Sequence, residues 1–136
     1  MFMIVPGLNN GTDIMTTTQT IITTLLGAFF VFASSVKLLG WHKLIFTTQL
    51  AFFVKYGLNR QWMFMVGAIE LTAAVLIISP LLITVPIAAS LSLVGAAGLA
   101  AVSFGAIACH LWFDSWRDGI PAMVTLVLSG YLLLVM

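Results

Sequence analysis

Three residues within or beside apolar stretches could carry chemistry in this chain: Lys37, Glu70 and His110. Glu70 lies near the middle of an apolar run, residues 61–78, and is the only acidic residue in four such runs. A carboxyl at that depth is costly when it is ionised and unpaired, so we expect Glu70 to be paired, protonated or in contact with water. Intramembrane carboxyls commonly mark functional sites, so Glu70 is the strongest candidate.

The spacing of these residues predicts that they meet. Lys37 ends the first apolar run, His110 lies near the end of the third, and Glu70 is about 13 Å along the second. On their helices, Ser34 shares a face with Lys37, and Ser103 shares one with His110. We therefore predict a small polar cluster inside a helical bundle, which could hold a proton-active group, a quinone head group or a small polar ligand.

Each member of this cluster also has a purely structural explanation. Lys37 could extend its ammonium from a helix end toward the membrane surface. His110, next to Trp112, could be an ordinary interfacial residue, and Glu70 could serve only as a structural partner for Lys37 or a serine. Three charged residues are most simply expected in a solvated loop: Asp114, Arg117 and Asp118.

Several other kinds of site are disfavoured. A single cysteine, Cys109, excludes an intramolecular disulfide, a dithiol redox centre and a cysteine-rich zinc site. Only His42 and His110 could be axial haem ligands, and we expect neither haem nor a covalently bound cofactor. Glu70, His110 and Asp114 form no tight metal-binding motif, so no metal site is predicted. The five basic residues form no patch for nucleic acid.

The composition identifies the elements that must position these residues. Of 136 residues, 62% are hydrophobic and 7% charged, whereas soluble domains are about a quarter charged. The chain is therefore predicted to be an all-α integral membrane protein, with the lipid bilayer as its first partner. We expect a four-helix bundle with spans at about residues 19–39, 61–78, 86–111 and 120–136.

The remaining segments are too short or too polar to cross a bilayer. Residues 1–18 lack the features of a signal peptide and are predicted to be a flexible tail, with Met1 or Met15 as the true start. The apolar run within residues 40–60 is too short to span, so we predict an interfacial or re-entrant helix there. Its polar residues, Lys43, Thr47, Thr48 and Lys55, are expected to face water. Ser79 and Pro80 are expected to end the second span, because the residue before a proline disfavours helix.

Small residues predict how the spans pack. Ala97, Ala101 and Gly105 recur every four residues, a pattern that allows close helix approach in lipid. We therefore expect the third span to be the central packing helix. Gly67 precedes Glu70 on its helical face and should leave room around the carboxyl.

Charge and tryptophan positions predict the orientation. All five basic residues lie at or in two connections, residues 40–60 and 112–119, and all four tryptophans flank the same connections. Between four spans, these connections must share a side. The positive-inside rule then places both loops in the cytoplasm and both termini outside.

Four short motifs resemble the DoxX and DoxX-like family of small four-helix membrane proteins, over roughly residues 20 to 136. They are FASSVKL at 32–38, GAIEL at 67–71, SP at 79–80 and AIACH at 106–110. The resemblance implies a bundle in the bacterial inner membrane in which Lys37, Glu70 and His110 match recurrent family positions. Where the family often has Ser-Gly before the lysine, this chain has Ser34-Ser35. Some members are subunits of thiosulfate:quinone oxidoreductase systems.

These observations support three hypotheses. The leading one is a subunit of a quinone-linked redox complex with a site around Glu70. Because the chain has no electron carrier, it would be an oxidoreductase subunit that depends on a membrane or membrane-associated redox partner protein. The second is a non-catalytic accessory or assembly subunit. The third is a small-solute or proton-coupled transporter, acting as a homo-oligomer.

Overall fold

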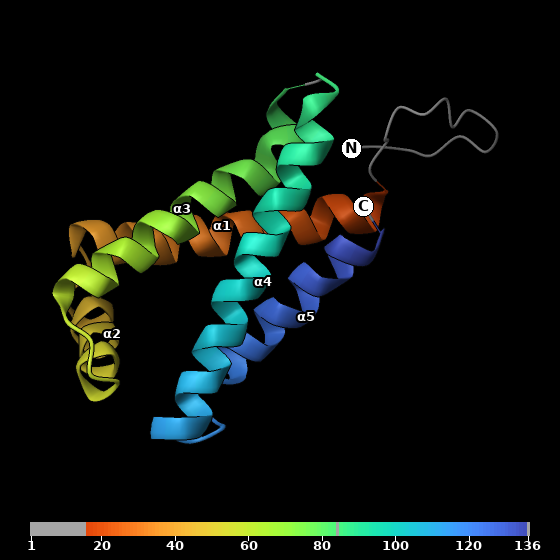
Figure 1. The fold of residues 1–136 in the computed structure, drawn as a ribbon. Coiled ribbons are helices and arrows are strands. Elements are labelled where there is room, and N and C mark those ends of the chain that lie inside the picture. The colour runs from red at the N-terminus through yellow and green to blue at the C-terminus, as the bar shows by residue number, and fades with distance from the viewer. Residues whose placement is uncertain (1–15, 84, 136) are drawn as a thin grey trace.

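The computed structural model describes residues 16–83 and 85–135, and these residues form five helices (Figure 1). Three of the helices, α1, α3 and α4, are long and apolar enough to cross a bilayer, and α5 is a shorter apolar helix. The predicted all-α membrane bundle, with a short helix after the first span, is confirmed. The bounds are α1 Thr17–Leu39, α2 Lys43–Lys55, α3 Arg60–Leu82, α4 Ile87–Phe113 and α5 Ile120–Val135.

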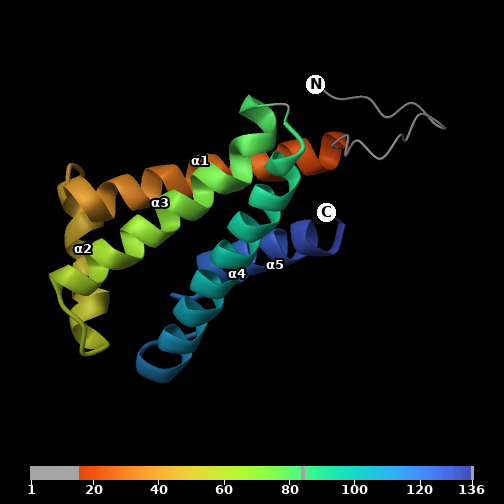
Figure 2. The ribbon, with the colours of Figure 1, turned by 45° about the horizontal axis from the view of Figure 1, so that its top comes forward.

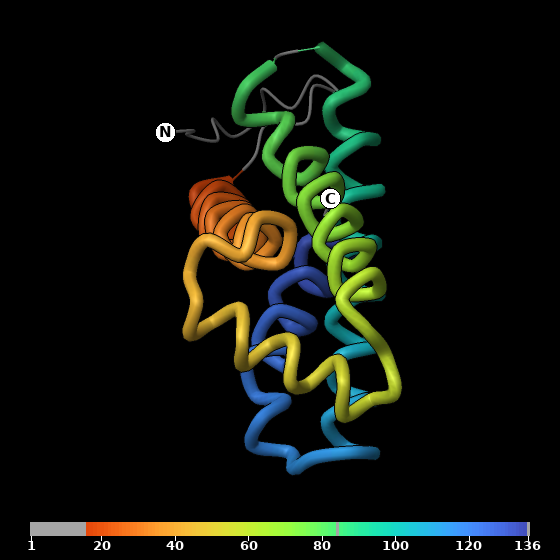
Figure 3. Tube along the Cα trace, turned by 90° about the vertical axis from the view of Figure 1, so that its left-hand side faces the viewer, coloured from red at the N-terminus to blue at the C-terminus, as the bar shows by residue number. Residues whose placement is uncertain are grey.

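The four longer helices pack in the order α1, α3, α4, α5, and α5 returns to touch α1. Figures 1 and 2 show that α3 runs beside α1 and that the C-terminal end of α3 meets α4. The ring closes where Gln19 Nε2 donates to the Val135 carbonyl at 3.3 Å. In Figure 3, α2 crosses the same end of the bundle as the α4–α5 turn. The third predicted span, α4, is therefore one of two helices with two extensive partners, α3 being the other.

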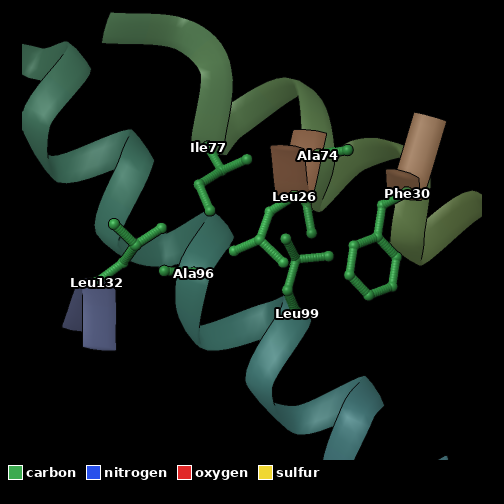
Figure 4. Packing of buried hydrophobic residues seen from close by; sticks show 8 residues of the cluster. Leu26, Phe30, Ala74, Ile77, Ala96, Leu99 and Leu132 are labelled. Atoms are coloured by element: carbon green, nitrogen blue, oxygen red, sulfur yellow. The ribbon is translucent and has the colours of Figure 1, made fainter. Parts of the chain in front are cut away.

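The core lies where these helices cross, and it combines larger side chains with alanines (Figure 4). Leu26 and Phe30 from α1 pack against Ile77 of α3 and Leu99 of α4. Because lipid is as apolar as leucine, this packing stabilises the bundle chiefly through close contact, and alanines let the backbones approach. The other members of the cluster are Ala73, Ala74, Ala96 and Leu132.

The first helix begins earlier than residue 19, where the sequence had placed its start. Thr16 accepts a hydrogen bond from the Gln19 N–H at 3.0 Å, and the Gln19 side chain accepts one from the Thr16 N–H at 3.2 Å. This capping box satisfies two backbone donors and sets the helix start at Thr17. The rest of the predicted tail, residues 1–15, lies outside the described part of the chain.

The second span does not end at Ser79 and Pro80, and that prediction was wrong. Helix α3 continues through Pro80 to Leu82. Proline has no N–H for the carbonyl four residues earlier, which belongs to Leu76. The Ser79 hydroxyl donates to that carbonyl at 2.7 Å, so its hydrogen bond is replaced and the helix continues.

The predicted packing stripe on α4 was also wrong. Ala97, Ala101 and Gly105 are exposed on the outer surface of the chain. The buried face carries Ser92, Gly95, Ala96, Leu99 and Ser103 instead. At Gly95, a Cβ would lie 2.6 Å from the Ala73 carbonyl oxygen, so the close approach of α3 and α4 depends on this glycine. The small-residue spacing was correct in kind, but it was assigned to the wrong face of the helix.

Candidate functional site

An ion pair between α1 and α3 is the centre of the site. Lys37 Nζ lies 2.9 Å from Glu70 Oε1, and the two side chains are only 9% and 6% exposed. At this distance the ammonium and the carboxylate form a buried ion pair between the two helices. Gly67 makes it possible, because a Cβ there would lie 2.9 Å from the Lys37 Cβ. The expectation that Gly67 leaves room beside Glu70 agrees with this geometry.

A cavity of about 370 Å³ lies beside this ion pair. Helices α1, α2, α3 and α4 all contribute to its walls. Its volume is in the range of pockets that hold small molecules in a mostly apolar lining with a few polar groups. The polar and ionisable groups include Lys37, Glu70, His110 and Gln49, and α2 adds three aromatic rings: Phe52, Phe53 and Tyr56.

A second cavity, of about 230 Å³, shares the Lys37–Glu70 pair and His110 with the first and extends toward α5. Ser103 and Thr125 lie in its wall, with their hydroxyl oxygens 2.7 Å apart. The structure thus brings together Lys37, Glu70, His110 and Ser103. It does not bring in Ser34, whose buried hydroxyl donates to the Val31 carbonyl of its own helix at 3.1 Å.

A polar network joins the end of α2 to the end of α4, and we call it the α2–α4 clasp. The Tyr56 hydroxyl donates to Asp114 Oδ2 at 2.8 Å and lies 2.9 Å from His110 Nδ1. His110 Nδ1 is 3.2 Å from the same Asp114 oxygen. Lys55 forms an ion pair with the other oxygen, Asp114 Oδ1. The clasp therefore consists of Lys55, Tyr56, His110 and Asp114.

Asp114 is not a solvated loop residue, and that prediction was wrong. Its side chain is 1% exposed, because Lys55, Tyr56 and His110 surround it. The hydrogen bond from Lys55 lowers the pKa of Asp114 below its usual value, against the effect of burial, and Tyr56 and His110 lower it further. Burial raises the pKa of Tyr56, and the Asp114 carboxylate raises it further. The clasp therefore holds a carboxylate and a neutral phenol at neutral pH.

The contribution of α2 was missed from the sequence. Gln49, Phe52 and Tyr56 follow one another at helical spacing, so they share the face that lines the cavity. The prediction assigned the polar groups of α2 to water and considered no partner for its other face. Lys43, Thr47, Thr48 and Lys55 are indeed exposed.

One group of potential metal ligands occurs in the described residues. Donor atoms of His110, Asp114 and Asp118 all lie within 4.8 Å of one another. The two Asp114 oxygens already contact Lys55 and Tyr56. An ammonium beside the carboxylate opposes a second cation there, so we assign no metal to this group.

The chain was also compared with known proteins. A family model described as the DoxX-like family matches residues 21–132. This range includes both cavities and the α2–α4 clasp. Neither the curated proteins nor the solved structures gave a match.

Proposed function

The chain belongs to the DoxX-like family of membrane proteins, and from this premise we propose that it is a subunit of a quinone-linked redox complex. Its role would be to bind the quinone head group in the cavity beside Lys37 and Glu70. The observation that carries the proposal is a buried ion pair in the wall of a mainly apolar, partly aromatic cavity. The redox assignment itself comes from the family resemblance.

The cavity suits a flat ring with polar substituents. Phe52 and Phe53 offer apolar surface to the ring, while the Lys37 ammonium can donate hydrogen bonds to a ring oxygen. A bound quinone would accept two electrons and two protons. The chain's single cysteine, Cys109, cannot form a dithiol, so a partner protein with a redox cofactor would supply the electrons.

The mouth of the cavity supports a lipid-soluble ligand. Gly105 lines the cavity, yet it is exposed and has open space where a Cβ would be. It lies eight residues before the end of α4, a helix long enough to cross a bilayer. The cavity is therefore expected to open toward the hydrocarbon region.

Quinone binding tests this proposal directly. We would reconstitute the chain in lipid nanodiscs and titrate a short-chain ubiquinone analogue by calorimetry. Gly105→Trp should block the cavity and weaken binding at least about tenfold, equivalent to about 1.4 kcal/mol. Gly130→Trp is the matched control, because Gly130 also has open space around its Cβ position but does not line the cavity. Equal binding by both variants, or no binding by the wild type, would refute the proposal.

The competing hypotheses predict different results in the native complex. We would purify the chain with its partners in mild detergent and compare Glu70→Gln with the wild type. A quinone-binding role predicts slower quinone reduction per complex. An accessory subunit predicts fewer complexes with unchanged turnover. A transporter predicts purification without a redox partner and uptake into proteoliposomes that Glu70→Gln abolishes.

We also propose that the protein lies in a bacterial inner membrane with residues 40–60 and 112–119 in the cytoplasm and both termini outside. The Lys55–Asp114 contact supports a shared side for the two connections. The basic residues gathered at these connections support the cytoplasmic assignment.

A further inference from the structure

The α2–α4 clasp determines which nitrogen of His110 carries the proton in the neutral ring. An ionised carboxylate can only accept hydrogen bonds, and the single Tyr56 hydroxyl proton is directed to Asp114. His110 Nδ1 then has two acceptors beside it, the Tyr56 oxygen at 2.9 Å and Asp114 Oδ2 at 3.2 Å. Both contacts require a hydrogen on Nδ1. In the neutral ring, Nε2 is therefore left with its lone pair.

His42 provides an internal contrast. It caps the N-terminus of α2, where its Nδ1 accepts the Ile45 backbone N–H at 3.3 Å. An accepting Nδ1 has no hydrogen, so the neutral ring of His42 carries its proton on Nε2. The only two histidines of the chain should thus adopt opposite tautomers.

We propose that Asp114 and Tyr56 position His110 as a base, and that His110 Nε2 takes a proton from a ring hydroxyl of a quinol-type ligand in the cavity. This inference rests on the proposed function and adds the reduced, hydroxylated ligand and the group with which it exchanges a proton. During quinone reduction, the His110 imidazolium donates this proton to the reduced ring, and the proposed step is the reverse of that transfer. In the step, the O–H bond of the ligand breaks and an N–H bond forms at Nε2. The products are a ligand oxyanion and an imidazolium, and no electrons leave the ligand in this step.

Three features of the site support this role. His110 lines both cavities, so its ring borders the space where a ligand would lie. Phe52 packs edge-on against the ring, with centroids 5.2 Å apart, and fixes its plane. Asp114 supplies the negative charge that stabilises the imidazolium as it forms, as carboxylates do in other aspartate–histidine pairs. Asp114 and Tyr56 are thus positioning residues.

The tautomers can be measured by nitrogen NMR on protein labelled with ¹⁵N-histidine in nanodiscs, with His42→Gln for assignment. At alkaline pH, His110 should show hydrogen on Nδ1 and His42 on Nε2. Asp114→Asn can place an amide N–H beside Nδ1 and should shift the His110 proton to Nε2. Lys55→Met is the matched control, since it breaks the ion pair but keeps Asp114, and it should preserve the tautomer.

Adding decylubiquinol then tests the ligand. The expected result is a shift of the His110 Nε2 resonance that saturates with quinol, is absent at His42 and is lost in Gly105→Trp. If His110 of the wild-type protein carries its hydrogen on Nε2, the inference is overturned, and this measurement needs neither a ligand nor a variant. Quinol that binds in the cavity and leaves Nε2 unchanged would also overturn it. Absence of quinol binding would refute the ligand assignment together with the proposed function, and the wild-type tautomer would show separately whether the positioning holds.

Discussion

At the scale of single residues, the Lys37–Glu70 pair combines structural and functional demands. Both partners are buried, so each compensates a charge that would otherwise be costly to bury. Such a pair contributes less net stability than its geometry suggests, because burying both charges is itself unfavourable. Loss of one partner, however, leaves the other charge buried without compensation, which is strongly destabilising. The contact between Glu70 and Lys37 therefore has a structural role and is also part of the candidate site.

A double-mutant cycle measures this coupling. Glu70→Gln should destabilise the protein by about 3 kcal/mol, because it leaves the Lys37 ammonium buried without a counter-charge. Adding Lys37→Met should restore much of the loss. Reversible unfolding in mixed micelles gives the free energies. Additive losses in the two single variants would show that the pair is not coupled.

The α2–α4 clasp predicts acid sensitivity. The pKa of Asp114 is lower in the folded chain than its ordinary value of 3.8, so the ionised form stabilises the fold. This stabilisation is complete above about pH 4 and is lost as the pH falls toward the lowered pKa. The groups that face Asp114 are Lys55, Tyr56, His110 and Asp118. The melting temperature should fall more steeply below about pH 4 in the wild type than in Asp114→Asn, and equal slopes would contradict this origin.

Residue type and helical spacing predicted part of the site. Lys37, Glu70 and His110 could be placed together because they lie at similar depths on successive helices. Tyr56, Gln49 and the role of Asp114 could not be placed, because they depend on how α2 docks under the bundle. No local pattern specifies that docking, since no residue of α2 is fully buried.

At the scale of helices, α3 shows how a proline is tolerated inside a membrane span. Ser79→Ala should destabilise the chain by about 1 kcal/mol, because the Leu76 carbonyl loses its donor. In a Pro80→Ala background the backbone N–H of residue 80 returns, so the same Ser79 change should have much less effect. Unfolding free energies of the four proteins test this, and equal effects in both backgrounds would show that the hydroxyl does not replace the missing N–H.

Helix α4 explains why the sequence predicted close packing but chose the wrong face. Small residues occur on most sides of the middle of this helix. The face with Ala97, Ala101 and Gly105 was therefore one of two candidate packing faces, the other being the face that includes Gly95 and Leu99. The choice between the two faces depends on where α3 and α5 pack against α4, and the spacing of small residues along α4 carries no information about that.

Two glycines of α4 distinguish the faces by experiment. Gly95→Ala should destabilise the chain by about 1–3 kcal/mol, because its Cβ would meet the backbone of Ala73 and Ile77. Gly105→Ala should stabilise it by about 0.5–1 kcal/mol, because the Cβ meets open space and alanine favours helix. Thermal unfolding in detergent measures both changes. A loss of stability in Gly105→Ala would show that Gly105 does take part in helix packing.

At the scale of the whole molecule, the shared side of the two connections can be tested by labelling. In a Cys109→Ser background, we would place single cysteines at Thr47, Ser115 and Val85, which are all exposed. A membrane-impermeant maleimide should label Val85→Cys in intact spheroplasts, and Thr47→Cys and Ser115→Cys only after lysis. Different sides for Thr47 and Ser115 would contradict the fold, whereas a reversal of all three would contradict only the orientation.

The exposed position of Gly105 at the cavity mouth affects how fully a ligand from the membrane occupies the cavity. A ligand that enters from the hydrocarbon is already enriched there by partition, so the site can be filled at a dissociation constant that would leave it empty in water. Weak binding of this kind implies a short residence time, because affinity is set mostly by the dissociation rate. Extraction into detergent dilutes the lipid phase and should empty the site, and adding back lipid with the ligand should refill it.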